Sequence, residues 1–167
     1  MMKQKINNYP LLFILLMILS GTMMQCSSTK SSTNMGEGVV EKMLNDHSFI
    51  FIAERMTPLR GRSYTLTSTY DVRVNNDSLV SYLPYFGRAY SAPMDPTKVG
   101  TQFTSTNFTY HIAVVKNNQW RISLVPKDVS SIQELVFTIF DNGSTSLNIT
   151  STSRDQISYS VYLKKIE

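Results

Sequence analysis

Apolar side chains recur along the chain with two different spacings. Between Val39 and Ser48 they follow the helical period, so one short amphipathic helix is predicted there. From Phe49 onward apolar and polar positions alternate, which is typical of β-strands that turn one face toward a core. About eight strands are predicted in this way. They cover residues 49–53, 66–74, 79–83, 108–114, 120–124, 135–140, 147–149 and 157–163, with strand character resuming at Thr101 after an irregular connection over residues 84–99.

Short turns separate many of these strands. Asn75–Asp77, Asn117–Asn118 and Asp141–Gly143 are the clearest, because Asn, Asp and Gly tolerate the backbone of tight turns. Hairpins in series place neighbouring strands side by side, so the fold class is mainly β, with an antiparallel meander after the helix. The meander is expected to form a strongly curled sheet or a small barrel. A two-sheet sandwich is the alternative.

The N-terminal residues 1–25 have the layout of a secretory signal peptide. Lys3 and Lys5 form its basic start, and Leu11–Leu19 is an apolar stretch too short to span a bilayer. A single anchoring helix from Pro10 to Met24 is the alternative, but Ser20 and the two residues after it interrupt it. Ordinary signal cleavage needs small residues in an A-x-A-like site, and the first alanine of the chain is Ala53.

Lipoprotein processing is the remaining route, with Cys26 as the lipid-carrying residue. The Cys–Ser–Ser step and the Ser/Thr-rich residues after it resemble bacterial lipoproteins, although Gln25 stands where a small residue is usual. An incidental free thiol is the other interpretation of Cys26. The predicted organisation is therefore a signal peptide (1–25), a lipid-anchored flexible tether (26–38) and one β-rich domain (39–167). Its expected place is the outer membrane of the cell envelope, facing the periplasm.

Composition narrows the classes of partner and cofactor. Removing residues 1–25, which carry Lys3 and Lys5 and no acid, lowers the formal net charge from +4 to +2. No Lys/Arg run is present to bind phosphates, so nucleic acid is not expected as a partner. Cys26 is the only cysteine and there are two histidines, so neither an intrachain disulfide nor a His/Cys metal site is expected. We expect no cofactor and no metal; the membrane, through the lipid, and a small molecule or an envelope protein are the expected partners.

One run of residues resembles a known family. Ser81–Tyr90 reads SYLPYFGRAY, which resembles the signature of a Bacteroidetes lipoprotein family catalogued as domain of unknown function 4251. The similarity extends over about Phe49–Ile166 and includes the hairpin at Trp120 and the closing Arg154 and Ile157–Tyr159; Ser160 departs from it, where glycine is expected. The resemblance implies an envelope address and a β-rich fold. It implies no reaction, because the family has no assigned activity.

The same run supplies the candidate binding residues. Tyr82, Tyr85 and Tyr90 surround one cation, Arg88, and rings beside a guanidinium can bind an anion or a sugar. The alternative is a structural role, in which the aromatic side chains close one end of a barrel. We expect Phe86 to be buried in this structural way, and Arg88 and Tyr90 to be available to a ligand.

No catalytic motif is present, so the domain is not expected to be an enzyme. His111 lies among threonines with no G-x-S-x-G elbow in the chain, and no carboxylates stand in a recognisable catalytic pair. The alternative function is an envelope hydrolase with an unrecognised carboxylate or histidine site. One modification is expected: Asp77-Ser78-Leu79 fits a short motif for O-glycan attachment in the envelope, so Ser78 is a candidate glycosylation site.

Overall fold

The computed structural model describes residues 38–91, 100–116 and 119–166. The predicted signal peptide, the lipidation site at Cys26, nearly all of the tether and the predicted turn at Asn117–Asn118 lie outside these residues. The described residues belong to one compact unit, residues 32–167. None of their helices is long and apolar enough to cross a membrane.

A single short helix precedes the sheet in the described part, as predicted. Helix α2 covers Val39–Asn45 and buries Val40, Met43 and Leu44, which recur at helical spacing on one face. Gly38 precedes the helix with a φ of +88°, a conformation that glycine adopts without strain. The helix ends three residues before the predicted Ser48, and the chain then enters the first strand.

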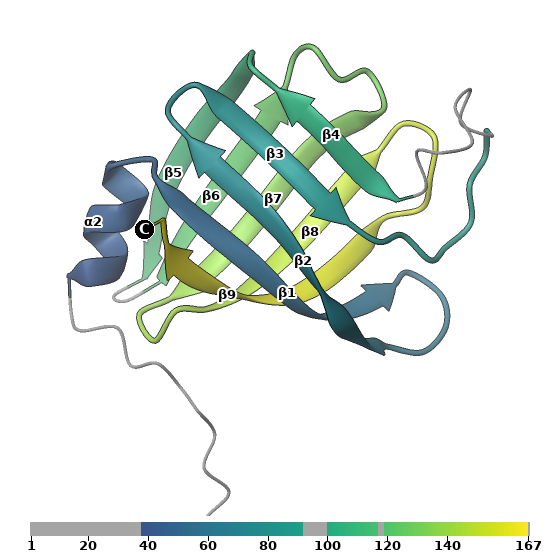
Figure 1. The fold of residues 1–167 in the computed structure, drawn as a ribbon, viewed down its shortest axis with the longest axis horizontal. Coiled ribbons are helices and arrows are strands. Elements are labelled where there is room, and N and C mark those ends of the chain that lie inside the picture. The colour runs from purple at the N-terminus through teal and green to yellow at the C-terminus, as the bar shows by residue number, and fades with distance from the viewer. Residues whose placement is uncertain (1–37, 92–99, 117–118, 167) are drawn as a thin grey trace, which may run out of the picture. The chain divides into compact units, whose positions relative to one another are not determined.

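The nine strands form one antiparallel sheet (Figure 1). The order across the sheet is β4-β3-β2-β1-β9-β8-β7-β6-β5. Every two consecutive strands except β4 and β5 are therefore hydrogen-bonded neighbours, and β1 pairs with β9 in the middle of the sheet. The predicted meander is thus confirmed, with its turns at Asn76–Asp77 and Asp141–Gly143. The strands are β1 Phe49–Pro58, β2 Tyr64–Asn75, β3 Ser78–Leu83, β4 Thr101–Ser105, β5 Phe108–Lys116, β6 Gln119–Pro126, β7 Ile132–Phe140, β8 Ser144–Ser151 and β9 Ile157–Lys165.

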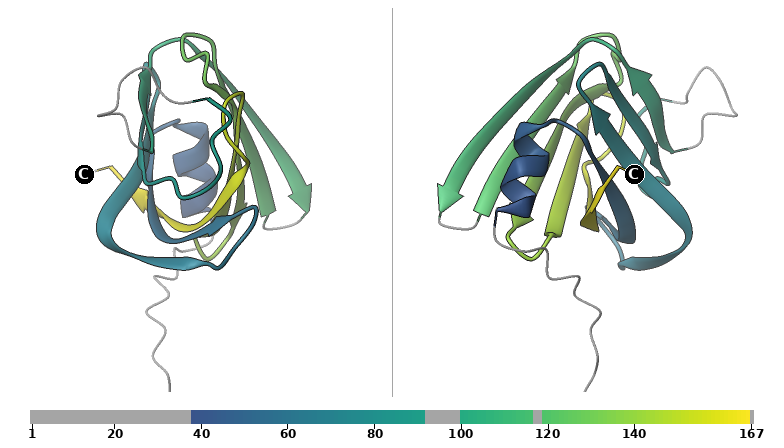
Figure 2. Two further views of the ribbon diagram at one scale, coloured as in Figure 1. Left: turned by 90° about the vertical axis from the view of Figure 1, so that its right-hand side faces the viewer. Right: turned by 60° about the vertical axis from the view of Figure 1, so that its left-hand side comes forward.

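The sheet curls into a half-barrel because its two edge strands are joined by the chain. Strands β4 and β5 lie at opposite edges, yet only residues 106 and 107 connect them. The edges therefore meet at one corner and diverge away from it (Figure 2). The sequence left a curled sheet, a barrel and a sandwich open, and the structure is a single curled sheet that does not close.

Helix α2 lies in the wedge between the diverging edges (Figure 2). The Tyr110 hydroxyl of β5 donates a hydrogen bond to the Leu44 carbonyl at 2.9 Å, and the ring of Tyr110 lies 3.9 Å from that of His47. These contacts hold α2 against β5 at the open side of the half-barrel. Burial raises the pKa of the Tyr110 hydroxyl far above its usual value.

The core fills the concave face of the sheet with large apolar side chains. Phe51 of β1 and Phe137 of β7 stack with ring centroids 4.1 Å apart, and both are fully buried. The Tyr159 hydroxyl donates to the Pro84 carbonyl at 2.6 Å, which satisfies the polar end of a buried ring. All of the buried apolar side chains in the described part lie between Val40 and Leu163, so this part contains a complete core of its own.

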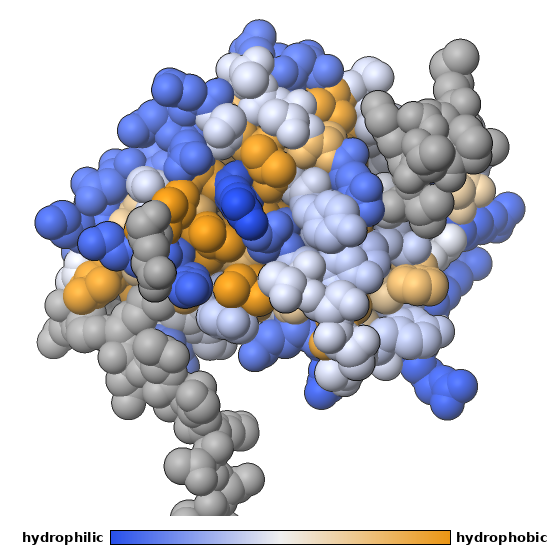
Figure 3. All heavy atoms as spheres, in the orientation of Figure 1, coloured by the Kyte–Doolittle hydropathy of each residue, from blue (hydrophilic) through white to orange (hydrophobic). Residues whose placement is uncertain are grey.

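The convex face of β1–β3 mixes apolar and polar side chains (Figure 3). Ile50 and Ile52 are half-buried there, and the pairing of β1 with β2 places Arg73 beside Ile50. The Arg73 Nε donates to the Asp71 carboxylate at 2.8 Å, with 58% of the Arg73 side chain exposed. Asp71, whose side chain is 12% exposed, therefore has a local structural partner in a pair of which only the Arg73 half is open to solvent.

Candidate functional site

The LPYFGRAY run leaves β3 and crosses to the loop between β8 and β9. The Tyr90 N–H donates to the Ser153 carbonyl at 2.8 Å, and the Asp155 N–H donates to the Arg88 carbonyl at 3.0 Å. Ala89 and Arg154 form an antiparallel bridge between these hydrogen bonds. Two segments more than sixty residues apart in the chain are thus joined through their backbones. We call residues 84–91 the crossing segment.

Tyr85 is the residue that joins the crossing segment to the loop through its side chain. Its hydroxyl lies 2.9 Å from the Arg88 carbonyl and 3.1 Å from the Asp155 carbonyl, both of which accept hydrogen bonds. The Arg154 guanidinium lies over its ring, 5.0 Å from the centroid. Burial, with a smaller contribution from the Asp155 charge, raises the pKa of the Tyr85 hydroxyl. Tyr85 therefore keeps a neutral hydroxyl, and the Arg154 guanidinium is held in place beside it.

Gly87 is required by this arrangement. A Cβ added at Gly87 would lie 2.6 Å from the Tyr85 hydroxyl oxygen, closer than real Cβ contacts come. A larger residue at position 87 would therefore displace the Tyr85 ring, whose hydroxyl bonds the Arg88 and Asp155 carbonyls.

A pocket of about 560 Å³ opens beside Tyr85 and Arg154. It lies between the first residues of β4 and the loops that connect β6 to β7 and β8 to β9. Strands β7 and β9 begin at the pocket, whereas α2 lies beside the other end of β9, so pocket and helix occupy opposite ends of the half-barrel (Figure 2). Its lining comprises Tyr85, Ser91, Gly100, Thr101, Gln102, Phe103, Ser130, Ser131, Ile132, Ile149, Ser151, Thr152, Ser153, Arg154, Asp155 and Ile157.

Hydroxyl groups dominate the polar wall of the pocket. The Ser151 hydroxyl donates to the Ser131 carbonyl at 2.7 Å, and the Thr152 hydroxyl donates to the Ser130 carbonyl at 3.1 Å. These bonds fix the two loops to each other, so the wall is built before any ligand arrives. The lining also includes Ser130 and Ser131, both of which are exposed.

One cation and one carboxylate complete the polar side. The Arg154 guanidinium donates through one nitrogen to the Gly100 carbonyl at 2.5 Å, and it also covers Tyr85. A guanidinium has five N–H donors, so most remain for another acceptor. The Asp155 carboxylate accepts a hydrogen bond from the Tyr90 hydroxyl, and that bond raises the pKa of Tyr90. The apolar floor is formed by Ile132, Ile149 and Ile157, each at most 8% exposed.

The structure separates the four predicted binding residues. Tyr85 lines the pocket, but Tyr82 lies on the convex face of β3, where its ring stacks on Tyr70 at 5.7 Å. Arg88 and Tyr90 are exposed beside each other, with the guanidinium 5.8 Å from the ring centroid, and neither lines the pocket. In the described part of the chain, these four residues therefore do not form a single cleft.

The expectation that Phe86 is buried is wrong. Its side chain is 59% exposed and stacks on Tyr64, with ring centroids 5.8 Å apart. The crossing segment contributes its backbone and Tyr85 to the fold, and it turns Phe86 outward. Ser78, the candidate glycosylation site, is half-buried at the first position of β3, directly after the exposed Asp77.

Two of the alternative catalytic residues lie close together on strands β5 to β7, because His111 pairs in register with Ser123 of β6, which contacts Glu134. His111 is exposed on β5, and Glu134 on β7 accepts a hydrogen bond from the Ser123 hydroxyl at 2.5 Å. Among the described residues that line the pocket, Asp155 is the one carboxylate. Across the described ranges, no three His, Cys, Asp or Glu side chains gather as a metal site would require.

Sequence reasoning missed the pocket because its walls come from three distant stretches. The signals were the pairs Ser130-Ser131 and Ser151–Ser153 directly before Arg154, each a run of small hydroxyl residues at a strand end. Such runs are ordinary in loops. Nothing in the sequence states that the loops meet each other and the start of β4.

Comparison with known proteins identifies similar chains. A family model described as Domain of unknown function (DUF4251) matches residues 31–163. The crystal structure of a DUF4251 family protein from Bacteroides eggerthii matches with a TM-score of 0.56 and 16% sequence identity, covering 75% of this chain and 84% of that one. At 16% identity, the structural match is evidence of a shared fold only. No curated protein matches the chain.

Proposed function

Since this chain belongs to the DUF4251 family, for which no activity is described, we propose a function from its pocket: the domain is a non-catalytic module that binds a small polar molecule. The observation that carries this proposal is the Arg154 guanidinium, fixed over Tyr85 at the rim of a pocket of about 560 Å³. Pockets of a few hundred Å³ are typical of small-molecule sites.

The lining favours an anionic ligand with hydroxyl or amide groups. A guanidinium binds carboxylates through paired, charge-assisted hydrogen bonds, and Arg154 is already oriented by Gly100 and Tyr85. The hydroxyls of Ser130 and Ser131 supply donors and acceptors for the remaining polar groups of the ligand. The isoleucine floor supports an apolar face. A sugar acid or a short peptide with a free carboxylate has this combination of groups.

Binding is favoured over hydrolysis by the contents of the pocket. Glycoside hydrolysis uses two carboxylates about 5–9 Å apart, and the part of the lining that the structure describes includes one, Asp155. That carboxylate accepts a hydrogen bond from the Tyr90 hydroxyl, which occupies part of its acceptor capacity. The lining includes no histidine.

The address proposed with this function is the cell envelope. The apolar stretch Leu11–Leu19, the missing A-x-A site and the Cys26-Ser27-Ser28 step support an exported lipoprotein anchored at Cys26. In this proposal the domain is anchored in the outer membrane, faces the periplasm and binds small molecules there.

Substitution of Arg154 tests the binding proposal. Sugar acids, amino acids and short peptides are screened by the rise in melting temperature, and the affinities of positive compounds are measured by calorimetry. Arg154→Gln should weaken binding by about ten- to a hundredfold, the value of one or two charge-assisted hydrogen bonds. Arg121→Gln, which removes an exposed guanidinium from β6, is the matched control and should bind like the wild type. An Arg154→Gln protein of unchanged affinity would contradict the proposal.

A further inference from the structure

We propose that the hairpin between β1 and β2, together with part of the crossing segment, is a docking surface for anionic lipid headgroups. The surface, which we call the hairpin patch, consists of Leu59, Arg60, Arg62, Tyr64, Phe86 and Arg88. It goes beyond the proposed ligand-binding function, because none of these six residues lines the pocket.

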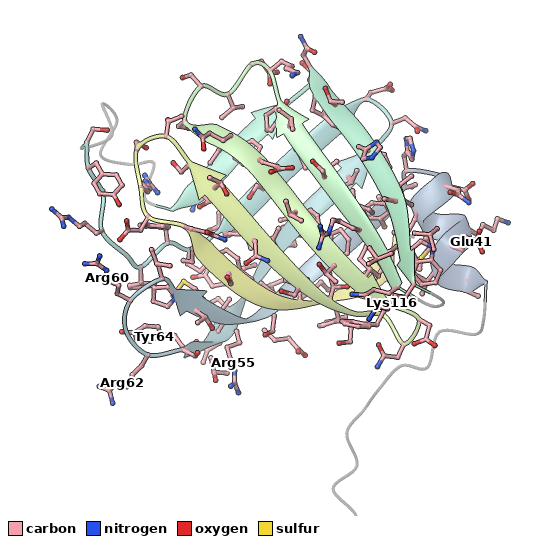
Figure 4. The ribbon with its side chains drawn as sticks, turned by 180° about the vertical axis from the view of Figure 1, so that it is seen from behind. Glu41, Arg55, Arg60, Arg62, Tyr64 and Lys116 are labelled. Atoms are coloured by element: carbon pink, nitrogen blue, oxygen red, sulfur yellow. The ribbon has the colours of Figure 1, made fainter. Side chains whose placement is uncertain are left out.

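The patch combines cations with large exposed apolar side chains. Leu59 is 61% exposed at the start of the hairpin loop, and Phe86 and Tyr64 are 59% and 49% exposed. Figure 4 shows Arg60, Arg62 and Tyr64 gathered at this hairpin, with Arg60 and Arg62 pointing away from the sheet. Single exposed apolar residues are ordinary on protein surfaces, but three together beside guanidinium groups indicate an interaction site.

Contacts between the two segments make the patch continuous. The rings of Tyr64 and Phe86 stack with centroids 5.8 Å apart, which joins the hairpin to the crossing segment. The charges of both Arg60 and Arg88 act on the Tyr90 hydroxyl, so these two guanidinium groups lie on the same side of the molecule. The bulge in β1 between Ala53 and Arg55 lets the hairpin bend away from the rest of the strand.

The charge of the patch selects an anionic partner. Residues 54–64 contain three arginines, Arg55, Arg60 and Arg62, against one acid, Glu54. On the crossing segment side, Asp155 is the nearby carboxylate, and the Tyr90 hydroxyl donates to it. The remaining positive charge fits phosphate groups, which guanidinium binds well. An acidic polysaccharide is also negatively charged, but it has no apolar region that could bury the exposed Leu59 and Phe86. The interface of a bilayer does bury apolar and aromatic side chains.

The proposed lipid anchor keeps the patch within reach of a bilayer, and to this extent the inference rests on the proposed address. Eleven residues lie between Cys26 and Gly38, and the twelve residue steps span about 40 Å when extended. The ten residues of β1 separate the α2 end of the domain from the hairpin by at most about 33 Å. The hairpin can therefore touch the membrane in which Cys26 is anchored.

Vesicle binding without the anchor tests the patch. Residues 38–167, which contain the complete core, are sedimented with vesicles of phosphatidylcholine alone and of an equal mixture with phosphatidylglycerol. We expect binding to the mixed vesicles only, weakened by salt. The triple variant Arg60→Gln, Arg62→Gln, Arg88→Gln should bind about tenfold or more weakly. Leu59→Ser with Phe86→Ser should also lower binding, at unchanged charge.

The matched control removes equal charge elsewhere. Arg121→Gln, Lys164→Gln and Lys165→Gln are exposed positions on β6 and β9, and this triple variant should bind like the wild type. Equal loss in both triple variants, or wild-type binding to a soluble acidic polysaccharide but not to vesicles, would overturn the proposal; so would a wild type that binds no vesicle. Thermal unfolding of each variant verifies its fold. The pocket is tested separately through Arg154, so either proposal can fail alone.

Discussion

At the scale of single residues, position relative to the concave face decides what an aromatic side chain does. Phe51 and Phe86 are chemically identical, but Phe51 is fully buried against Phe137 and Phe86 is 59% exposed on Tyr64. The alternating pattern of β1 predicts the burial of Phe51. No such pattern exists in the crossing segment, because an irregular backbone does not alternate its side chains, and the sequence therefore predicted Phe86 wrongly.

Truncation of these two rings should separate their roles. Phe51→Ala should lower the free energy of unfolding by about 3–5 kcal/mol, because a cavity replaces a stacked ring in the core. Phe86→Ala should change it by less than about 1 kcal/mol. Urea unfolding followed by circular dichroism measures both values. Similar losses in the two variants would mean that Phe86 is packed in solution.

At the scale of secondary-structure elements, the sequence predicted where most strands lie but not how the sheet that they form curls. Alternation locates a strand such as β9, because Ile157, Tyr159, Val161 and Leu163 must all face the core. It cannot show that β4 and β5, neighbours in the chain, lie at opposite edges of the sheet. That arrangement depends on the corner between them, where the deciding contacts come from the distant Asp128.

The corner between β4 and β5 can be tested through Asp128. Its carboxylate accepts hydrogen bonds from the Ser105 hydroxyl at 2.5 Å and from the Thr106 N–H at 2.9 Å. The bond from Ser105, followed by that from Thr106, lowers the pKa of Asp128 below its ordinary 3.8. A lowered native pKa means that the carboxylate stabilises the fold above pH 3.8, and that this contribution is lost as the pH falls through the lower native value.

Asp128→Asn should therefore lower the melting temperature at neutral pH, because an amide accepts these hydrogen bonds less strongly. The difference between variant and wild type should shrink as the pH falls below the ordinary carboxyl value of 3.8 and the wild-type carboxyl takes up its proton. Melting temperatures across this range measure it, with Asp77→Asn at an exposed turn as the control. A difference that is constant with pH would exclude the carboxylate from holding the corner.

At the scale of the whole molecule, the pocket and α2 occupy opposite ends of the half-barrel, and the proposed anchor enters through α2. This leaves the pocket end free to face solvent or, through the hairpin patch, the membrane. The sequence predicts the anchor from a short apolar stretch before Cys26, and this remains a prediction. It could not indicate the pocket, because Gly100, Ser131 and Arg154 come together only when the whole sheet has curled.

The anchor is tested by removing its attachment point. The wild-type chain expressed in its native host should enter the detergent phase of a Triton X-114 extraction, and Cys26→Ala should move to the aqueous phase or accumulate uncleaved. Cys26→Ala tests the thiol, while Ser27→Ala beside it is the control and should partition like the wild type. A Cys26→Ala protein that is processed and partitions like the wild type would show that Cys26 carries no lipid.

Backbone amide NMR shifts recorded during titration with a bound compound show whether a small polar molecule binds in the pocket. We expect shifts concentrated in three stretches that only the pocket brings together, residues 100–103, 130–132 and 151–155, and unchanged amides in α2 and β5. Shifts concentrated at α2, at β5 or on the convex face of β1–β3, with the pocket amides unchanged, would contradict binding in the pocket.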